Sequence, residues 1–169
     1  MAAMIFCGKS SKLVYTCAML LALLLSGAAQ TQTSTQKTVN GHATGAFDVN
    51  LTQQPSETGD PILSRMVLSK QYHGDLTGSG GGQMLSAGPP AKGSGGYVSM
   101  EKVNATLAGR IGSFVLQHSG TMDHGKLDLR IHVVPDSGTG ELVGLAGKVN
   151  IRIEAGGKHF YDFEYTLPD

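Results

Sequence analysis

The stretch that decides the fold is YVSMEKVNATLAGRIGSFVLQHSGTM, residues 97–122. From Tyr97 to Leu107 the odd-numbered positions form one face of the expected strand and the even-numbered positions form the other, with Glu101 on the odd-numbered face. The run from Ile111 repeats this period of two. Such alternation is typical of half-buried strands, and Gly109-Arg110 between the runs can form a two-residue hairpin turn. The stretch therefore predicts two adjacent antiparallel strands.

With the turn at Gly109-Arg110, Ala108 faces Ile111. The predicted cross-strand pairs are Ala105 with Phe114, Val103 with Leu116, and Glu101 with His118. A carboxylate and an imidazole then meet on the apolar face, where they could act as base and acid or orient a polar ligand group. The alternative is a buried polar pair that satisfies itself and fixes the strand register. Tyr97 shares this face. It belongs either to a polar cluster near one mouth of the β-barrel that the further strands predict, or to the core.

Further alternating runs lie on both sides of this hairpin. The expected strands cover 43–51, 63–72, a short pair at 75–77 and 83–87, then 97–107, 111–122, 127–134, a run from Val149 to Ile153, and 159–167. Glycine-rich segments at 78–82 and 88–96 are expected to be loops at a mobile rim, and 141–147 a short helical turn. With the short pair counted as one strand, the prediction is an all-β, eight-stranded antiparallel up-and-down β-barrel, lipocalin-like in shape, with a sandwich as the alternative.

Composition and charge narrow the class of protein. The chain has 169 residues, of which 15% are charged, and a formal net charge of +0, so it has room for one domain and lacks the basic excess that nucleic acids usually require. The predicted barrel domain is 41–169, and a Thr- and Gln-rich segment at 30–40 is expected to be a flexible leader.

Residues 1–29 have the pattern of a cleaved signal peptide. Lys9 and Lys12 precede an apolar stretch that ends in small residues, which predicts cleavage near Ala29-Gln30. The apolar stretch is short for a retained membrane anchor, the alternative interpretation. Cleavage would also remove Cys7 and Cys17. The expectation is a periplasmic or secreted protein with no stable membrane span and no cysteine chemistry.

Aromatic residues recur at strand spacing near the C-terminus. Tyr161, Phe163 and Tyr165 share one face of the last expected strand, and Phe114 and Met122 share the inner face of 111–122. Together with Tyr97, these residues are the candidate lining of a ligand cavity. Core packing is the alternative, because an eight-stranded barrel can be filled with side chains or can hold one small ligand.

Other motifs are weaker. Asp136-Ser137-Gly138-Thr139 resembles the catalytic element of aspartic proteases, but Pro135 and the short remaining chain favour a turn. The histidines lack tight metal-ligand spacing, and the glycine run at 78–82 lacks the lysine of a phosphate-binding loop. No metal and no cofactor are expected.

The chain resembles a bacterial family known as domain of unknown function 3224. The residues that carry the resemblance are Gly96-Tyr97, Glu101, the run 107–122, the run 133–142, Gly144-Leu145, Gly147, Gly157-Lys158-His159, Tyr161, Phe163 and Tyr165. The resemblance covers the chain from Gly41 onward. It implies a closed eight-stranded barrel of the allene oxide cyclase-like type and brings no established reaction with it.

Three functions remain open from the sequence. The leading hypothesis is an exported barrel that holds a small, partly apolar ligand. The second is a cofactor-independent isomerase or cyclase that uses Glu101 and His118 for proton transfer. The third is a filled barrel with a structural or interaction role, which would form a homodimer.

Overall fold

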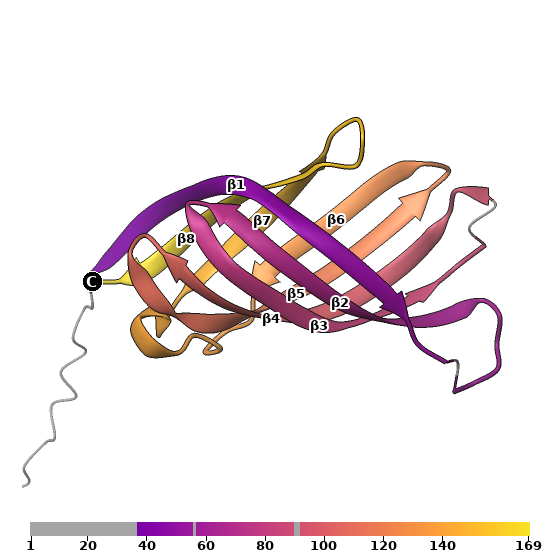
Figure 1. The fold of residues 1–169 in the computed structure, drawn as a ribbon, viewed down its shortest axis with the longest axis horizontal. Coiled ribbons are helices and arrows are strands. Elements are labelled where there is room, and N and C mark those ends of the chain that lie inside the picture. The colour runs from indigo at the N-terminus through magenta and orange to yellow at the C-terminus, as the bar shows by residue number, and fades with distance from the viewer. Residues whose placement is uncertain (1–36, 56, 90–91) are drawn as a thin grey trace, which may run out of the picture. The chain divides into compact units, whose positions relative to one another are not determined.

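The computed structural model describes residues 37–55, 57–89 and 92–169, and the predicted signal at 1–29 lies outside the described residues. Eight strands form one closed antiparallel barrel in which each strand pairs with the next and β8 pairs with β1 (Figure 1). The strands are β1 (Thr38–Gln53), β2 (Leu63–Gly74), β3 (Leu76–Ala87), β4 (Gly95–Leu107), β5 (Arg110–Asp123), β6 (Lys126–Val133), β7 (Ala146–Ile153) and β8 (His159–Pro168). The predicted fold class is confirmed. None of the helices in these residues is long and apolar enough to cross a membrane.

The β4–β5 turn lies one residue earlier than predicted. Ala108 and Gly109 form it, with φ values of 50° and 80°, and Leu107 pairs with Arg110. Two positive φ angles are what a type I′ hairpin turn requires, and that turn fits the twist of the flanking strands. The predicted pairing of Glu101 with His118 is therefore wrong: Ser99 faces His118 and Glu101 faces Leu116.

Strand β3 runs through the glycine segment that was expected to form a loop. Residues 78–82 pair with both β2 and β4, so the prediction of a rim loop there is wrong. The reason is close packing: a Cβ on Gly78 or Gly82 would overlap backbone atoms of β4, and one on Gly80 would overlap the Glu101 carboxylate. Glycine is the residue that permits such an approach.

Strand β1 begins earlier than expected. Thr38 pairs with Pro168 of β8, so residues 38–40 of the expected leader belong to the barrel. This pairing closes the barrel and satisfies the backbone groups that an open edge would expose.

One end of the barrel is closed by the β6–β7 connection, which contains the short 3₁₀ helix η2 (Gly140–Leu142). Leu142 and Leu145 from this connection are fully or almost fully buried in the core cluster. Asp136, with a φ of 58°, lies in the turn that begins it, and the Ser137 hydroxyl donates a hydrogen bond to the Val134 carbonyl at 2.6 Å. The segment that resembles a protease motif therefore forms a turn and helps to cap the barrel.

Candidate functional site

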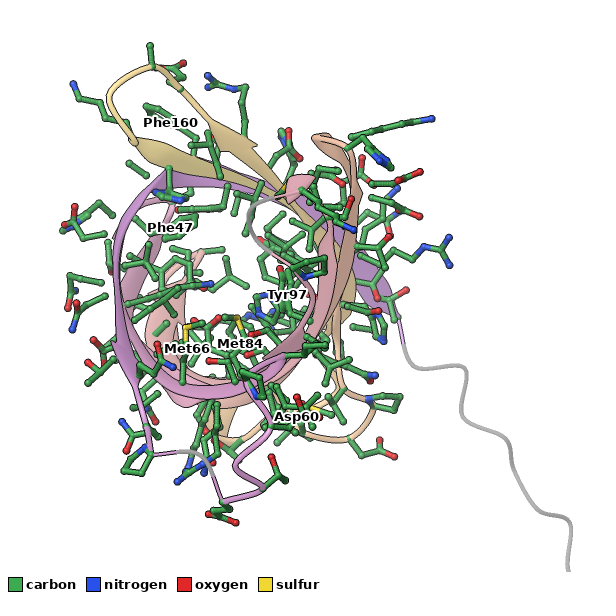
Figure 2. The ribbon with its side chains drawn as sticks, turned by 90° about the vertical axis from the view of Figure 1, so that its right-hand side faces the viewer. Phe47, Asp60, Met66, Met84, Tyr97 and Phe160 are labelled. Atoms are coloured by element: carbon green, nitrogen blue, oxygen red, sulfur yellow. The ribbon has the colours of Figure 1, made fainter. Side chains whose placement is uncertain are left out.

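The half of the barrel away from this cap encloses a cavity of ≈ 310 Å³. Its walls come from inward-facing positions of all eight strands and are mostly apolar. The lining residues are Phe47, Val49, Leu51, Leu68, Lys70, Met84, Tyr97, Ser99, His118, Met122, Leu127, Leu129, Ile151, Ile153 and His159. Figure 2 shows Phe47, Met66, Met84 and Tyr97 inside the ring of strands.

A second hollow, of ≈ 530 Å³, shares Met84, Tyr97, Met122 and Leu127 with this cavity. It is also lined by residues of the β1–β2 and β3–β4 connections, among them Ile62, Gly93 and Ser94. These connections lie at the end of the barrel opposite the η2 cap. The shared residues therefore mark a mouth through which a molecule can reach the cavity.

Four side chains form a buried polar cluster next to the cavity, which we call the floor cluster: Lys70, Tyr72, Glu101 and His118. Glu101 accepts hydrogen bonds at Oε2 from Lys70 Nζ at 2.7 Å and from His118 Nε2 at 3.1 Å. Its Oε1 accepts one from the Tyr72 hydroxyl at 2.8 Å. Glu101 is 0% exposed, whereas Lys70 and His118 also line the cavity. The carboxylate therefore holds the two nitrogen-bearing side chains in place from behind.

The floor cluster keeps Glu101 ionised. Burial alone would raise the pKa of the Glu101 carboxyl, but the hydrogen bond from His118, the Lys70 charge and the bonds from Lys70 and Tyr72 together hold that pKa below its usual range. Burial raises the pKa of the Tyr72 hydroxyl, and the Glu101 charge raises it further. Tyr72 therefore stays neutral and donates its proton to the carboxylate.

Local sequence explains how these groups can meet. Gly80 of β3 lies beside Glu101, and the missing side chain leaves the space that the carboxylate and Tyr72 occupy. The ammonium group of Lys70 lies 4.7 Å from the centre of the Phe47 ring, a cation–π contact that stabilises a desolvated charge. The ring of Tyr97 covers Gly120 in the same way that Glu101 fills the space beside Gly80.

Ser99 places a hydroxyl group at the cavity to which no described residue bonds. It is 4% exposed, and its Oγ is one of the buried side-chain atoms that have no hydrogen-bond partner among the described residues. It lies directly across from His118 in the β4–β5 pair, and both line the cavity. Buried hydroxyl groups normally have a partner, so Ser99 is a place where a bound molecule or water can bond.

The structure brings Glu101 and His118 together, although not as a direct cross-strand pair. The register is shifted by two residues relative to the prediction, so both side chains stay on the inner face and meet diagonally. Tyr97 and Met122 lie where the cavity and its mouth meet.

The other four predicted lining residues lie outside the cavity. Phe114 and Phe163 are 0% exposed and stack with ring centres 5.9 Å apart, and Tyr165 packs on Phe163 at 5.3 Å. The Tyr161 hydroxyl accepts a hydrogen bond from the Leu76 backbone N–H at 2.9 Å. These four residues form the packed core toward the η2 end.

Sequence reasoning missed Lys70, Tyr72 and Ser99 as parts of the site. A signal for Lys70 was present, because within the expected strand 63–72 it lies at every-second-residue spacing with Met66, Leu68 and Tyr72 and so shares their face. The charge of Lys70 argued against an inward position, because lysine is rarely buried without a partner and the sequence does not show that Glu101 is that partner.

Comparisons with known proteins agree with the barrel. The sequence model of a family described as "Protein of unknown function (DUF3224)" matches residues 43–165. A crystal structure of a protein with unknown function from this family, from Shewanella oneidensis MR-1, is similar with a TM-score of 0.71 and 46% sequence identity, covering 78% of this chain and 99% of that chain. No curated protein matches the chain.

Proposed function

The chain belongs to the DUF3224 family of proteins of unknown function, and from that premise we propose that its barrel binds one small, partly apolar molecule in the open half of the lumen. The observation that carries this proposal is the ≈ 310 Å³ cavity, with mostly apolar walls and with Lys70, Ser99 and His118 at one end. Apolar walls with a few convergent polar groups are typical of small-molecule sites. The packed half of the barrel supplies stability, whereas the hollow half is available for binding.

We place this function outside the cytoplasm, on the strength of the signal pattern at 1–29. The mature protein would start near Gln30. Mass spectrometry of the N-terminus of the protein from its native cells tests this part, and an intact Met1 terminus on the mature protein would contradict it.

Native mass spectrometry tests the binding proposal directly. The protein is purified from the extracytoplasmic fraction of its own cells, and its mass is compared before and after denaturation. The expected result is a small molecule that leaves on unfolding, at one copy per chain. Because a weakly held ligand can be lost during purification, a second experiment uses an added probe.

The probe is the neutral fluorescent dye N-phenyl-1-naphthylamine, which brightens in apolar surroundings. We expect saturable binding at one site, and we expect Met84→Trp to weaken it at least fivefold, because Met84 lines both the cavity and its mouth. Leu85→Trp is the matched control, because the next side chain along a strand points to the opposite face and Leu85 is exposed. Equal effects of the two variants, or no saturable binding, would reject the proposal.

Proton transfer in the cavity is the second candidate function. The observation that favours it is the 3.1 Å hydrogen bond from His118 to Glu101, which fixes the orientation of an imidazole that lines the cavity. In this case His118 exchanges a proton with the bound molecule, and Glu101 holds the His118 ring in position. Incubating the co-purified molecule with the protein and with His118→Ala separates the two functions: an isomerase loses product formation and keeps binding, whereas a binding protein shows only a changed affinity.

A further inference from the structure

We infer that the end of the ligand that reaches the floor cluster is polar but uncharged. It is a hydroxyl or carbonyl group rather than a carboxylate, phosphate or ammonium group. This inference rests on the proposed binding function and specifies the chemistry of its deepest contact. It follows from the charge balance of the floor cluster and from the groups that this cluster leaves available.

The charge of Lys70 is already balanced. Its Nζ lies 2.7 Å from Glu101 Oε2, with Lys70 9% exposed and Glu101 0% exposed. A ligand carboxylate at this depth would place a second anion beside Glu101, with one ammonium between them. A ligand ammonium would instead compete with Lys70 for Glu101. Either ion would lose its hydration without gaining a full partner, which is costly in a buried site.

The hydrogen-bonding groups that remain fit a neutral partner. The donors of Lys70 serve Glu101 and, at 3.4 Å, the Tyr72 hydroxyl, and its ammonium also faces the Phe47 ring. The Ser99 hydroxyl is buried without a partner within the described part of the chain. A hydroxyl can donate and accept, so it can bond either an alcohol or a carbonyl. The hydrogen bond of the His118 ring to Glu101 uses Nε2, which leaves Nδ1 for a second contact.

The rest of the cavity selects the body of the ligand. Phe47, Leu68, Met84 and Leu129 are among the apolar residues that line it. Its volume of ≈ 310 Å³ lies at the lower end of the usual range for small-molecule sites, about 300–1,000 Å³. This is room for an alkyl chain of medium length or a small aromatic ring system behind one polar group.

A matched series of probes tests the inference. The probes are 1-octanol, octanoate and octylammonium, together with 2-naphthol and 2-naphthoate. Their affinities are measured at pH 7.5 by displacement of N-phenyl-1-naphthylamine and by calorimetry. We expect 1-octanol and 2-naphthol to bind at least tenfold more tightly than their charged analogues, a difference of about 1.4 kcal/mol. Charged probes that bind as tightly as the neutral ones overturn the inference and leave the binding function standing. If no probe binds, the binding function fails as well.

Variants locate the polar end. Ser99→Ala is expected to weaken 1-octanol by about threefold to tenfold, the usual range for one hydrogen bond. Ser119→Ala, one residue away from His118 and exposed on the outer face, is the control and should have no effect. If Ser99→Ala also leaves 1-octanol binding unchanged, the polar end does not lie at the floor and the inference is wrong.

Glu101→Gln tests the charge argument itself. It leaves the charge of the Lys70 ammonium unbalanced, so the affinity for octanoate should rise at least tenfold relative to the affinity for 1-octanol. The double variant Lys70→Met/Glu101→Gln restores an uncharged floor and should again favour 1-octanol. The double variant also covers the case in which Glu101→Gln alone does not fold. An unchanged preference in the single variant, or a preference of the double variant for octanoate, contradicts the inference.

Discussion

Replacing Gly80 with alanine should destabilise the barrel, whereas replacing its neighbour Gly81 should not. Gly80 faces the lumen, where an added Cβ would overlap Glu101 Oε1 and lie 3.2 Å from a ring carbon of Tyr72. Gly81 faces outward, and no atom of the described structure lies within 4 Å of its added Cβ. Neither is among the described glycines with positive φ, so alanine causes no backbone strain at either position. The two variants therefore differ in one respect, the contact with the floor cluster.

The magnitude follows from that contact. The added methyl group forces Glu101 away from the Tyr72 hydroxyl, and a hydrogen bond to a charged group contributes about 1.5–3 kcal/mol. Overpacking a close-fitting core costs a further ~1–3 kcal/mol. The change from glycine to alanine returns about 0.4–1 kcal/mol by restricting the unfolded chain. Gly80→Ala should thus lower the free energy of unfolding by about 2–5 kcal/mol. Gly81→Ala should raise it by up to about 1 kcal/mol.

Urea unfolding at pH 7, followed by far-ultraviolet circular dichroism, measures both values by linear extrapolation. The midpoints of the two variants should fall on opposite sides of the wild-type midpoint, with unchanged slopes. If the free energies of unfolding of Gly80→Ala and Gly81→Ala differ by no more than about 0.5 kcal/mol, the usual range for surface substitutions, the close approach of Gly80 to Glu101 does not affect stability. Such a result would mean that Gly80 is not packed against the floor cluster.

Three other predictions test separate parts of the fold. The folded-state pKa of Glu101 lies below its unfolded value near 4.5, so its contribution to stability is present above about pH 4.5 and is lost as the pH falls through the folded pKa. Urea midpoints should therefore fall steeply in the wild type as the pH is lowered from about 6 to about 3, and fall less in Glu101→Gln. Ala108→Gly should raise the melting temperature by the equivalent of about 0.5–1 kcal/mol, because Ala108 has a φ of 50° that glycine adopts without strain, and a lower melting temperature would refute the turn assignment. Leu142→Ala should cost about 2–5 kcal/mol by opening a hole under the η2 cap while leaving dye affinity unchanged, with Val143→Ala, 61% exposed, as the control within about 0.5 kcal/mol of wild type.

The hairpin at 97–122 shows which part of a strand prediction is robust. Alternation fixes which side chains face inward, and that assignment survived although the turn lay at Ala108-Gly109. Moving a two-residue turn by one position shifts the pairing by two residues, and because side chains alternate with a period of two, every residue keeps its face. The sequence could therefore bring Glu101 and His118 to the same side without giving the correct partner of either.

The glycine run in β3 shows where local reasoning fails. Glycine has low strand propensity, so residues 78–82 favour a loop when they are judged alone. They form a strand by pairing with both β2 and β4, and they are glycine because β4 and the Glu101 carboxylate lie too close for a side chain at Gly78, Gly80 and Gly82. That requirement comes from β4, the next strand along the chain, and is not visible in residues 78–82 themselves.

Lys70 and Glu101 each explain why the other is buried. Either charge alone would be too costly on the inner face of a barrel, and together they satisfy one another at 2.7 Å. The same pairing changes the chemistry expected of Glu101. A carboxylate that shares its oxygens among Lys70, Tyr72 and His118 is stabilised in its ionised form and is a weaker proton acceptor than one bonded to histidine alone. Glu101 is therefore better suited to positioning Lys70 and His118 than to abstracting a proton, and any reaction or binding in this barrel begins at the groups that face the cavity.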